Sequence, residues 1–195
     1  MKKVFIVFTL VAGLTLGSKA QTGKTETVRS VDFSNYSYNV TLDEPKTIKL
    51  TAGKFEDGGS YDAGFPLYEL FGEPVYGDLN GDKGDEAVVE VKMSAPSSLR
   101  GFEVFAYTFQ NGAAKPLAQL NSERVQADYV KSYPKGALHY AGKNPPKIQN
   151  ARVIVEALVD GNFACPKFTA VFSYKLSGKK FVLIGKPMRK PFACN

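Results

Sequence analysis

The sequence predicts a mainly β protein, an antiparallel meander of about eight strands with at most one or two short helices. Three observations support this fold class. Short segments alternate between apolar and polar residues, turn-forming Gly, Asn, Asp and Pro separate them at short intervals, and helical periodicity is scarce. Because short turns join neighbouring segments, the meander is expected to form either a curled sheet or a partly closed barrel.

Four strands are predicted in the first two thirds of the chain. Residues 47–50 alternate in polarity before a Gly-rich break, and residues 88–93 place their odd-numbered apolar side chains on one face. Residues 102–110 also alternate and end at an Asn-Gly pair, which is among the strongest hairpin signals. Residues 117–120 are therefore expected to be the returning strand of this hairpin.

Three more strands are predicted in the last third. Residues 153–159 form a nearly continuous apolar run that is interrupted by Glu156. Residues 168–176 alternate, with the even-numbered apolar side chains on one face, and a Ser-Gly-Lys-Lys turn leads from them into residues 181–184. This pattern predicts a second hairpin.

Two segments, 65–71 and 122–131, are the candidates for helical turns. Pro134 and an Asn-Pro-Pro stretch predict an exposed loop over residues 132–149, which is expected to be flexible, as are residues 21–30. The sequence shows no internal repeat and no linker between domains. A single β-rich domain over residues 21–195 is therefore expected.

The first twenty residues have the pattern of a signal peptide. Lys2 and Lys3 precede an apolar run over residues 4–16, and residues 18–20 (Ser-Lys-Ala) supply a small-x-small cleavage signal. The apolar run is shorter than the roughly 20 residues that a membrane span needs. The pattern predicts a secreted or periplasmic protein without a membrane span.

The net charge says little about partners once residues 1–20 are set aside. The whole chain carries 25 basic and 19 acidic residues, a net charge of +6. Without the three lysines of residues 1–20, 22 basic residues face 19 acidic ones, which leaves +3. Such a small surplus is a weak argument for nucleic-acid binding, and no nucleic-acid partner is expected.

Cys165 and Cys194 are the two cysteines of the chain. In an oxidising compartment an isolated pair is expected to form one structural disulfide. Such a bond would close a loop of about 30 residues and stabilise the fold by roughly 3–4 kcal/mol. The alternative, a catalytic cysteine, would need a nearby base, and the sole histidine, His139, has no evident triad partner in the sequence.

An acidic, Gly-rich segment before the strand at 88–93 is the one motif that suggests chemistry. Asp78, Asn80 and Asp82 place oxygen-bearing side chains at every second position, and Gly84 and Glu86 follow at the next two. Alternating oxygen ligands in a loop loosened by glycines suit a hard cation such as Ca²⁺. The sequence therefore predicts a structural calcium site. The alternative is an acidic turn whose Asp and Asn side chains cap their own backbone.

The pattern D-x-N-G-D-x-G-D-E followed by Ala-Val-Val resembles the calcium loops of FG-GAP and VCBS repeats and the EF-hand-like loops of secreted bacterial proteins. The resemblance implies that Asp78, Asn80 and Asp82 supply side-chain oxygens and Gly84 a backbone carbonyl. It also implies that Glu86, at the ninth position, closes the shell directly or through water.

Two features of this loop differ from the pattern it resembles. Lys83 occupies the sixth position, where Gly usually supplies a positive φ, and the loop occurs only once. Asp85 is expected to lie just outside the shell or to compete with Glu86. The wider layout, with a Cys-Pro pair late in the chain, is similar to a group of uncharacterised exported bacterial proteins without an assigned activity.

Two functions are compatible with these patterns. The first is an exported, non-enzymatic binding or structural domain with one calcium-stabilised loop, whose partner would be an envelope or extracellular polymer. The alternative is an exported hydrolase acting on polysaccharide or peptidoglycan through carboxylates of residues 54–90, where ten acids face two lysines. Glu69 and Glu73 are one such pair, since they lie four residues apart and would share a face of a possible helical turn. Outside the loop, no constellation predicts catalytic or cofactor-binding residues.

Overall fold

The computed structural model describes residues 26–42, 44–61, 64–94, 100–162 and 164–193. Within them it is mainly β and antiparallel, with one α-helix, as the sequence predicts. The strands are β1 Ser37–Val40, β2 Lys46–Lys49, β3 Lys54–Glu56, β4 Leu67–Leu70, β5 Val75–Gly77, β6 Glu86–Ser94, β7 Arg100–Gln110, β8 Ala113–Asn121, β9 Leu138–Ala141, β10 Lys147–Ile148, β11 Arg152–Gly161, β12 Pro166–Ser177, β13 Lys180–Leu183 and β14 Met188–Pro191. The helices are the 3₁₀ turns η1 Val28–Ser30 and η2 Phe33–Asn35 and the α-helix α1 Ser122–Ser132.

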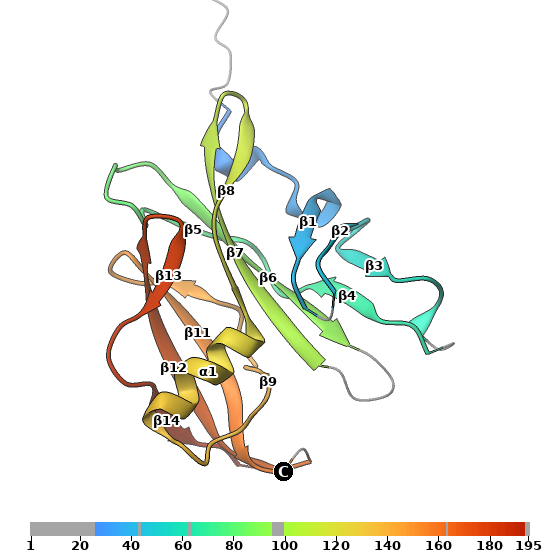
Figure 1. The fold of residues 1–195 in the computed structure, drawn as a ribbon. Helices are drawn as coiled ribbons and strands as arrows, with labels where there is room; N and C mark the ends of the chain where they lie inside the picture. The colour runs from blue at the N-terminus through green and yellow to red at the C-terminus, as the bar shows by residue number, and fades with distance from the viewer. Residues whose placement is uncertain (1–25, 43, 62–63, 95–99, 163, 194–195) are drawn as a thin grey trace, which may run out of the picture.

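Two six-stranded sheets form the body of the protein (Figure 1). The first has the order β3-β4-β6-β7-β8, with β5 paired to β6. The second has the order β10-β11-β12-β13, with β9 paired to β11 and β14 paired to β12. Neither order closes on itself within the described part of the chain, so the sheets are open. The β1–β2 hairpin is a separate small sheet.

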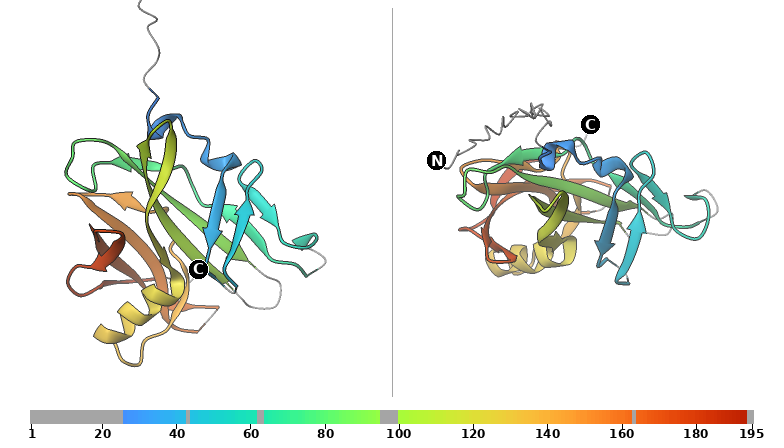
Figure 2. Two further views of the ribbon diagram at one scale, coloured as in Figure 1. Left: turned by 45° about the horizontal axis from the view of Figure 1, so that its top comes forward. Right: turned by 90° about the horizontal axis from the view of Figure 1, so that it is seen from above.

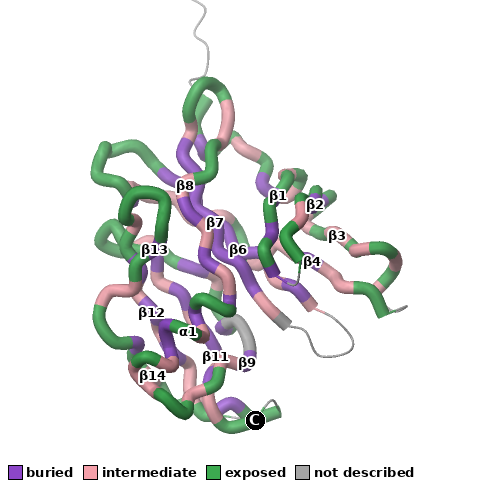
Figure 3. The backbone as a smooth tube through the Cα atoms, in the orientation of Figure 1, coloured by how far each residue is buried: buried purple, intermediate pink, exposed green. Residues whose placement is uncertain are grey.

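The first sheet is covered on both faces (Figure 2). One face packs against the second sheet and α1, in a core that contains Val88, Phe102 and Phe172. The opposite face packs against η1, η2 and the β1–β2 hairpin, in a second core that contains Val89 and Tyr107. Consecutive residues of β6 such as Val88 and Val89 therefore point into different cores, which explains why most of the strand is buried (Figure 3).

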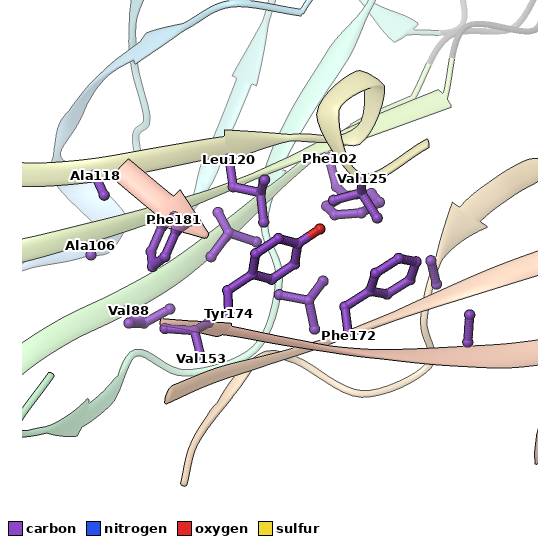
Figure 4. Close-up of a cluster of buried hydrophobic side chains, with 14 of the residues drawn as sticks. Val88, Phe102, Ala106, Ala118, Leu120, Val125, Val153, Phe172, Tyr174 and Phe181 are labelled. Carbon is purple, nitrogen blue, oxygen red and sulfur yellow. The ribbon is translucent and has the colours of Figure 1, made fainter. Parts of the chain in front are cut away.

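Tyr174 and Phe172 lie at the centre of the first core (Figure 4). Both side chains are fully buried, and their rings are stacked with centroids 6.2 Å apart and an interplanar angle of 9°. They belong to the even-numbered face of β12 that the alternation predicts. In β11 the odd-numbered side chains are buried, so its apolar run also alternates between a buried and a half-exposed face.

The helix α1 begins where the sequence predicts it. Asn121 is the N-cap, and its side-chain oxygen accepts a hydrogen bond from the Arg124 N–H at 3.0 Å. Val125 and Tyr129, one turn apart, are buried against the first core. No helix of the described residues is long and apolar enough to cross a membrane.

Two local predictions are wrong. Residues 65–71, predicted as helical turns, contain the strand β4, because Tyr68 fills the second core while Leu67 to Leu70 pair with β6. Residues 132–149, predicted as an exposed loop, contain β9 and β10, both paired with β11. Apolar residues there are few, and the pairing depends on a partner strand distant in the sequence.

Candidate calcium loop

The acidic segment closes a hairpin between β5 and β6. Gly77 pairs with Glu86, so residues 78–85 form the connection. The side chain of Leu79 is 3% exposed and belongs to the first core. The loop is thus held at both ends by strand pairing and near its start by one apolar anchor.

Asp78 organises the first half of the loop. Its Oδ1 accepts a hydrogen bond from the Gly81 N–H at 2.6 Å, and its Oδ2 accepts one from the Lys83 N–H at 3.0 Å. Gly81 and Lys83 both have positive φ, +87° and +70°. Lys83 therefore has the left-handed backbone that the loop needs at its sixth position, although it has a Cβ.

Asn80, Asp82 and Glu86 are brought together by hydrogen bonds. Asn80 Nδ2 donates to Asp82 Oδ2 at 3.0 Å and to Glu86 Oε1 at 2.9 Å. Asn80 Oδ1 accepts from the Asp82 N–H at 2.8 Å, and Asp82 Oδ1 accepts from the Gly84 N–H at 2.7 Å. The amide of Asn80 thus lies between two carboxylates and satisfies one oxygen of each.

Glu86 is the buried member of the group. Its side chain is 1% exposed, and its Oε2 accepts a hydrogen bond from the Leu79 N–H at 2.7 Å. Burial raises the pKa of Glu86, and the negative charges of Asp82 and Asp78 raise it further, against the lowering effect of the Leu79 hydrogen bond. A positive charge placed among these carboxylates would relieve this repulsion.

Asp85 points away from the group. Its Oδ2 lies 2.6 Å from Arg29 Nε, and the Arg29 guanidinium lies 4.6 Å from the centroid of the Tyr76 ring. The expected position of Asp85, just outside a calcium shell or in competition with Glu86, stays a prediction. A pocket of about 300 Å³ separates the loop from η1 and the end of β7; its lining includes Asp82, Gly84, Asp85, Glu86 and Thr108.

The described residues include no group of three or more His, Cys, Asp or Glu side chains arranged to hold a metal ion. Asn80, Asp82 and Glu86 are connected, whereas both oxygens of Asp78 bind backbone N–H groups of the loop. The hydrogen bonds from backbone N–H groups to Asp78, Asn80 and Asp82 are also those expected of the alternative, an acidic turn whose side chains cap their own backbone. In this conformation the Asn80 Nδ2 group faces the two carboxylates. For Asn80 Oδ1 to bind a calcium ion there, the Asn80 side chain would have to rotate and give up its hydrogen bonds to Asp82 and Glu86.

The structure places two of the carboxylates considered for hydrolysis, Glu69 and Glu90. Glu69 lies on β4 rather than on a helix, and its carboxylate contacts Lys54 Nζ at 2.9 Å. Glu90 is 2% exposed, and burial raises its pKa to about 8, opposed by the charge of Lys92. The Glu90 side chain lies inside the sheet region and lines none of the pockets described here.

Two predictions concern residues outside the described part of the chain. The signal peptide over residues 1–20 falls there entirely, and so does Cys194. No free cysteine is found among the described residues, and the Cys165–Cys194 disulfide stays a prediction. Residues 26–30 are the described part of the segment 21–30, and Val28 among them is 1% exposed in the second core.

Sequence analysis missed a pocket of about 660 Å³ beside the end of α1. Its lining includes Lys135, Asp160, Lys167, Phe168 and Arg189. These residues belong to separate segments that are brought together by strand pairing, so no local sequence motif predicts the pocket. The one available signal is the excess of Lys and Arg near the C-terminus.

No family model matches the chain, and no solved structure matches it. A curated protein of Arabidopsis thaliana, named as a putative RNA polymerase II subunit B1 CTD phosphatase RPAP2 homolog, is 25% identical over 150 residues. The matched part is 77% of this chain and 19% of that protein. The chain therefore spans about a fifth of the length of this relative.

This relative contradicts two predictions from the sequence. Its name associates this relative with RNA polymerase II, not with export, so the prediction of a secreted or periplasmic protein is overturned. The exported binding or structural domain, and its alternative as an exported hydrolase, are overturned by the same finding. An envelope or extracellular polymer as partner depended on that export.

Proposed function

We propose that the loop between β5 and β6 binds Ca²⁺ and that the ion stabilises the hairpin and the strand β6. The observation that supports the proposal is the connected group of Asn80, Asp82 and Glu86, in which the buried carboxylate of Glu86, with a raised pKa, lies beside one further acid, Asp82. The resemblance of the loop to FG-GAP and VCBS calcium loops supports the same assignment.

The ligands would be hard oxygen atoms at alternating positions. Asp78, Asn80 and Asp82 would contribute side-chain oxygens, Gly84 its carbonyl, and Glu86 a carboxylate at the base of the loop. Binding would neutralise the mutual repulsion of the three acids. Because β6 contributes side chains to both cores, an ion at its first residue would stabilise the centre of the fold.

Thermal unfolding in excess EGTA and then in millimolar Ca²⁺ tests the proposal. An ion held only by the folded state stabilises it by about 2.7 kcal/mol at a hundredfold excess over its dissociation constant. The melting temperature should therefore rise with Ca²⁺, and Asp82→Ala should abolish the rise.

A matched control for Asp82→Ala is Asp32→Ala. Asp32 also caps a turn, since its Oδ1 accepts a hydrogen bond from the Ser34 N–H at 3.1 Å, but it is the N-cap of η2 and not a residue of the loop. Both variants should lose some stability in EGTA, and only Asp82→Ala should lose the response to Ca²⁺. Equal responses of wild type and Asp82→Ala would reduce the loop to an acidic turn.

The relative gives a second candidate function, phosphatase activity. The sequence match over 77% of the chain is the observation that favours it. Hydrolysis of p-nitrophenyl phosphate, and of a phosphorylated CTD peptide of RNA polymerase II subunit B1, would test it directly with the full chain. Turnover at the level of a buffer blank with both substrates rejects this candidate and leaves the calcium proposal unaffected.

A further inference from the structure

The pocket beside α1 brings together four segments that are far apart in the sequence. Residues 132–137 are the last residue of α1 and the segment after it. Asp160 and Gly161 end β11, Lys167 and Phe168 lie near the start of β12, and Arg189 lies on β14. The strand β12 pairs with both β11 and β14, which places their ends side by side below α1 (Figure 1). The pocket is thus built on paired strands, and its volume is about 660 Å³.

Arg189 is held in place by aromatic rings. Its guanidinium carbon lies 3.4 Å from the centroid of the Tyr133 ring, 5.1 Å from that of Phe168 and 5.5 Å from that of Tyr129. The planar guanidinium combines such ring contacts with a fixed fork of N–H donors. The group is therefore positioned before any ligand arrives.

The donors of Arg189 are only partly used by the protein. Its Nη2 lies 3.3 Å from Asp160 Oδ2, while Nε is buried and has no hydrogen-bond partner. The carboxylate of Asp160 is shared with other donors, since Oδ2 accepts from Tyr129 Oη at 2.7 Å and Oδ1 from the Ala137 N–H at 3.1 Å. A guanidinium can donate five hydrogen bonds, so donors of Arg189 remain for a ligand.

The charges that line the pocket favour a doubly charged anion. Three cationic side chains, Lys135, Lys167 and Arg189, face the single carboxylate of Asp160, which leaves a surplus of two positive charges. A carboxylate carries one negative charge, whereas a phosphate monoester carries nearly two at pH 7. The remaining lining, with Phe168 and Tyr133, offers apolar surface to the organic part of such a ligand.

We propose that this pocket binds a phosphate monoester whose organic group is apolar or aromatic. Arg189 would donate to two phosphate oxygens, Lys135 and Lys167 would add positive charge, and Phe168 would contact the organic group. The site is independent of the calcium loop. The proposal concerns binding of the phosphate monoester and not its hydrolysis, so it does not depend on phosphatase activity.

Isothermal titration calorimetry of the full chain with phenyl phosphate tests the proposal, beside inorganic phosphate and phenylacetate. Phenyl phosphate should bind most tightly. Its affinity should fall from pH 8 to pH 5, because the second pKa of a phosphate monoester is about 6 and the dianion becomes a monoanion. Phenylacetate binding as tightly would overturn the preference for a dianion, and equal binding of inorganic phosphate would overturn the role of the apolar wall.

The variants separate a specific site from general attraction. Lys167→Ala and Arg189→Lys should each weaken binding of phenyl phosphate by about tenfold or more, because each removes charge-assisted hydrogen bonds. Lys175→Ala is the matched control, since Lys175 is an exposed lysine at the far end of the same strand. Wild-type affinity in Lys167→Ala would place the ligand elsewhere, even if Arg189→Lys folds poorly. The absence of p-nitrophenyl phosphate turnover would leave this test unchanged.

Discussion

The side-chain amide of Asn80 donates a hydrogen bond to Oε1 of Glu86 over 2.9 Å, which ties the exposed tip of the loop to its buried base. The same nitrogen donates to Asp82, so one neutral amide mediates between two acids. A cation at this position would offset the repulsion between these two acids.

Asn80→Asp should make the fold more dependent on Ca²⁺. The change removes the NH₂ donor and adds a third carboxylate beside Asp82 and Glu86, so repulsion should lower the melting temperature in EGTA. With millimolar Ca²⁺ the added charge becomes favourable, and the stabilisation by the ion should exceed that of wild type. Melting curves of both proteins in EGTA and in Ca²⁺ measure the difference. A variant less stable in both conditions, with no larger response to Ca²⁺, would contradict the prediction.

Lys83→Gly should stabilise the protein. Lys83 has φ +70°, a conformation that costs an L-residue with a Cβ roughly 1–2 kcal/mol. Glycine removes that cost, and part of the gain is lost to its greater freedom in the unfolded chain, so a net gain of about 0.5–1 kcal/mol is expected. Urea unfolding measures it. The control is Lys83→Ala, which also removes the charge but keeps the Cβ and should give no comparable gain.

The sequence predicts the long strands well because their alternation is local. Even-numbered residues of β12 and odd-numbered residues of β6 point into the cores as predicted. It fails at β4 and β9, where short strands depend on pairing with β6 and β11 rather than on their own pattern. The burial of β6 on both faces is explained only by the structure, which shows the layers that cover each face.

The two sites differ in how far the sequence predicts them. The acidic loop is contiguous, so the sequence identifies its oxygen-bearing residues, whereas the orientation of the Asn80 amide and the contact of Asp85 with Arg29 need the structure. The pocket around Arg189 combines residues from four segments, among them Lys135 and Asp160. No spacing rule connects such residues, because their proximity results from the order of strands in the second sheet.

Phe172→Ala should destabilise the protein by about 3–5 kcal/mol, because a fully buried aromatic side chain leaves a cavity that the surrounding core fills only in part. Tyr174 would lose its stacking partner in the same core. Urea unfolding gives the free-energy difference. Val182→Ala is the control, since Val182 is 43% exposed on β13 and should change stability by roughly 0.5 kcal/mol or less. Equal losses in both variants would contradict the position of Phe172 at the core centre.

Glu90 should make the protein less stable as the pH rises from about 5 to 8. Burial raises its pKa in the folded state to about 8, whereas the unfolded carboxyl titrates near 4.3. Between these values the folded protein holds a proton that the unfolded chain has released. The contribution of Glu90 to stability is therefore fully present below the unfolded pKa and is lost as the pH rises through the folded one.

Glu90→Gln isolates this effect, because the amide keeps the shape of the side chain and does not ionise. In wild type, Glu90 should contribute a slope of up to about −1.4 kcal/mol per pH unit to the plot of unfolding free energy against pH. In Glu90→Gln this contribution to the slope should be absent. The variant should therefore gain stability relative to wild type between pH 5 and pH 8. Urea unfolding at several pH values measures both curves, and parallel curves for the two proteins would show that Glu90 has an ordinary pKa in the folded state.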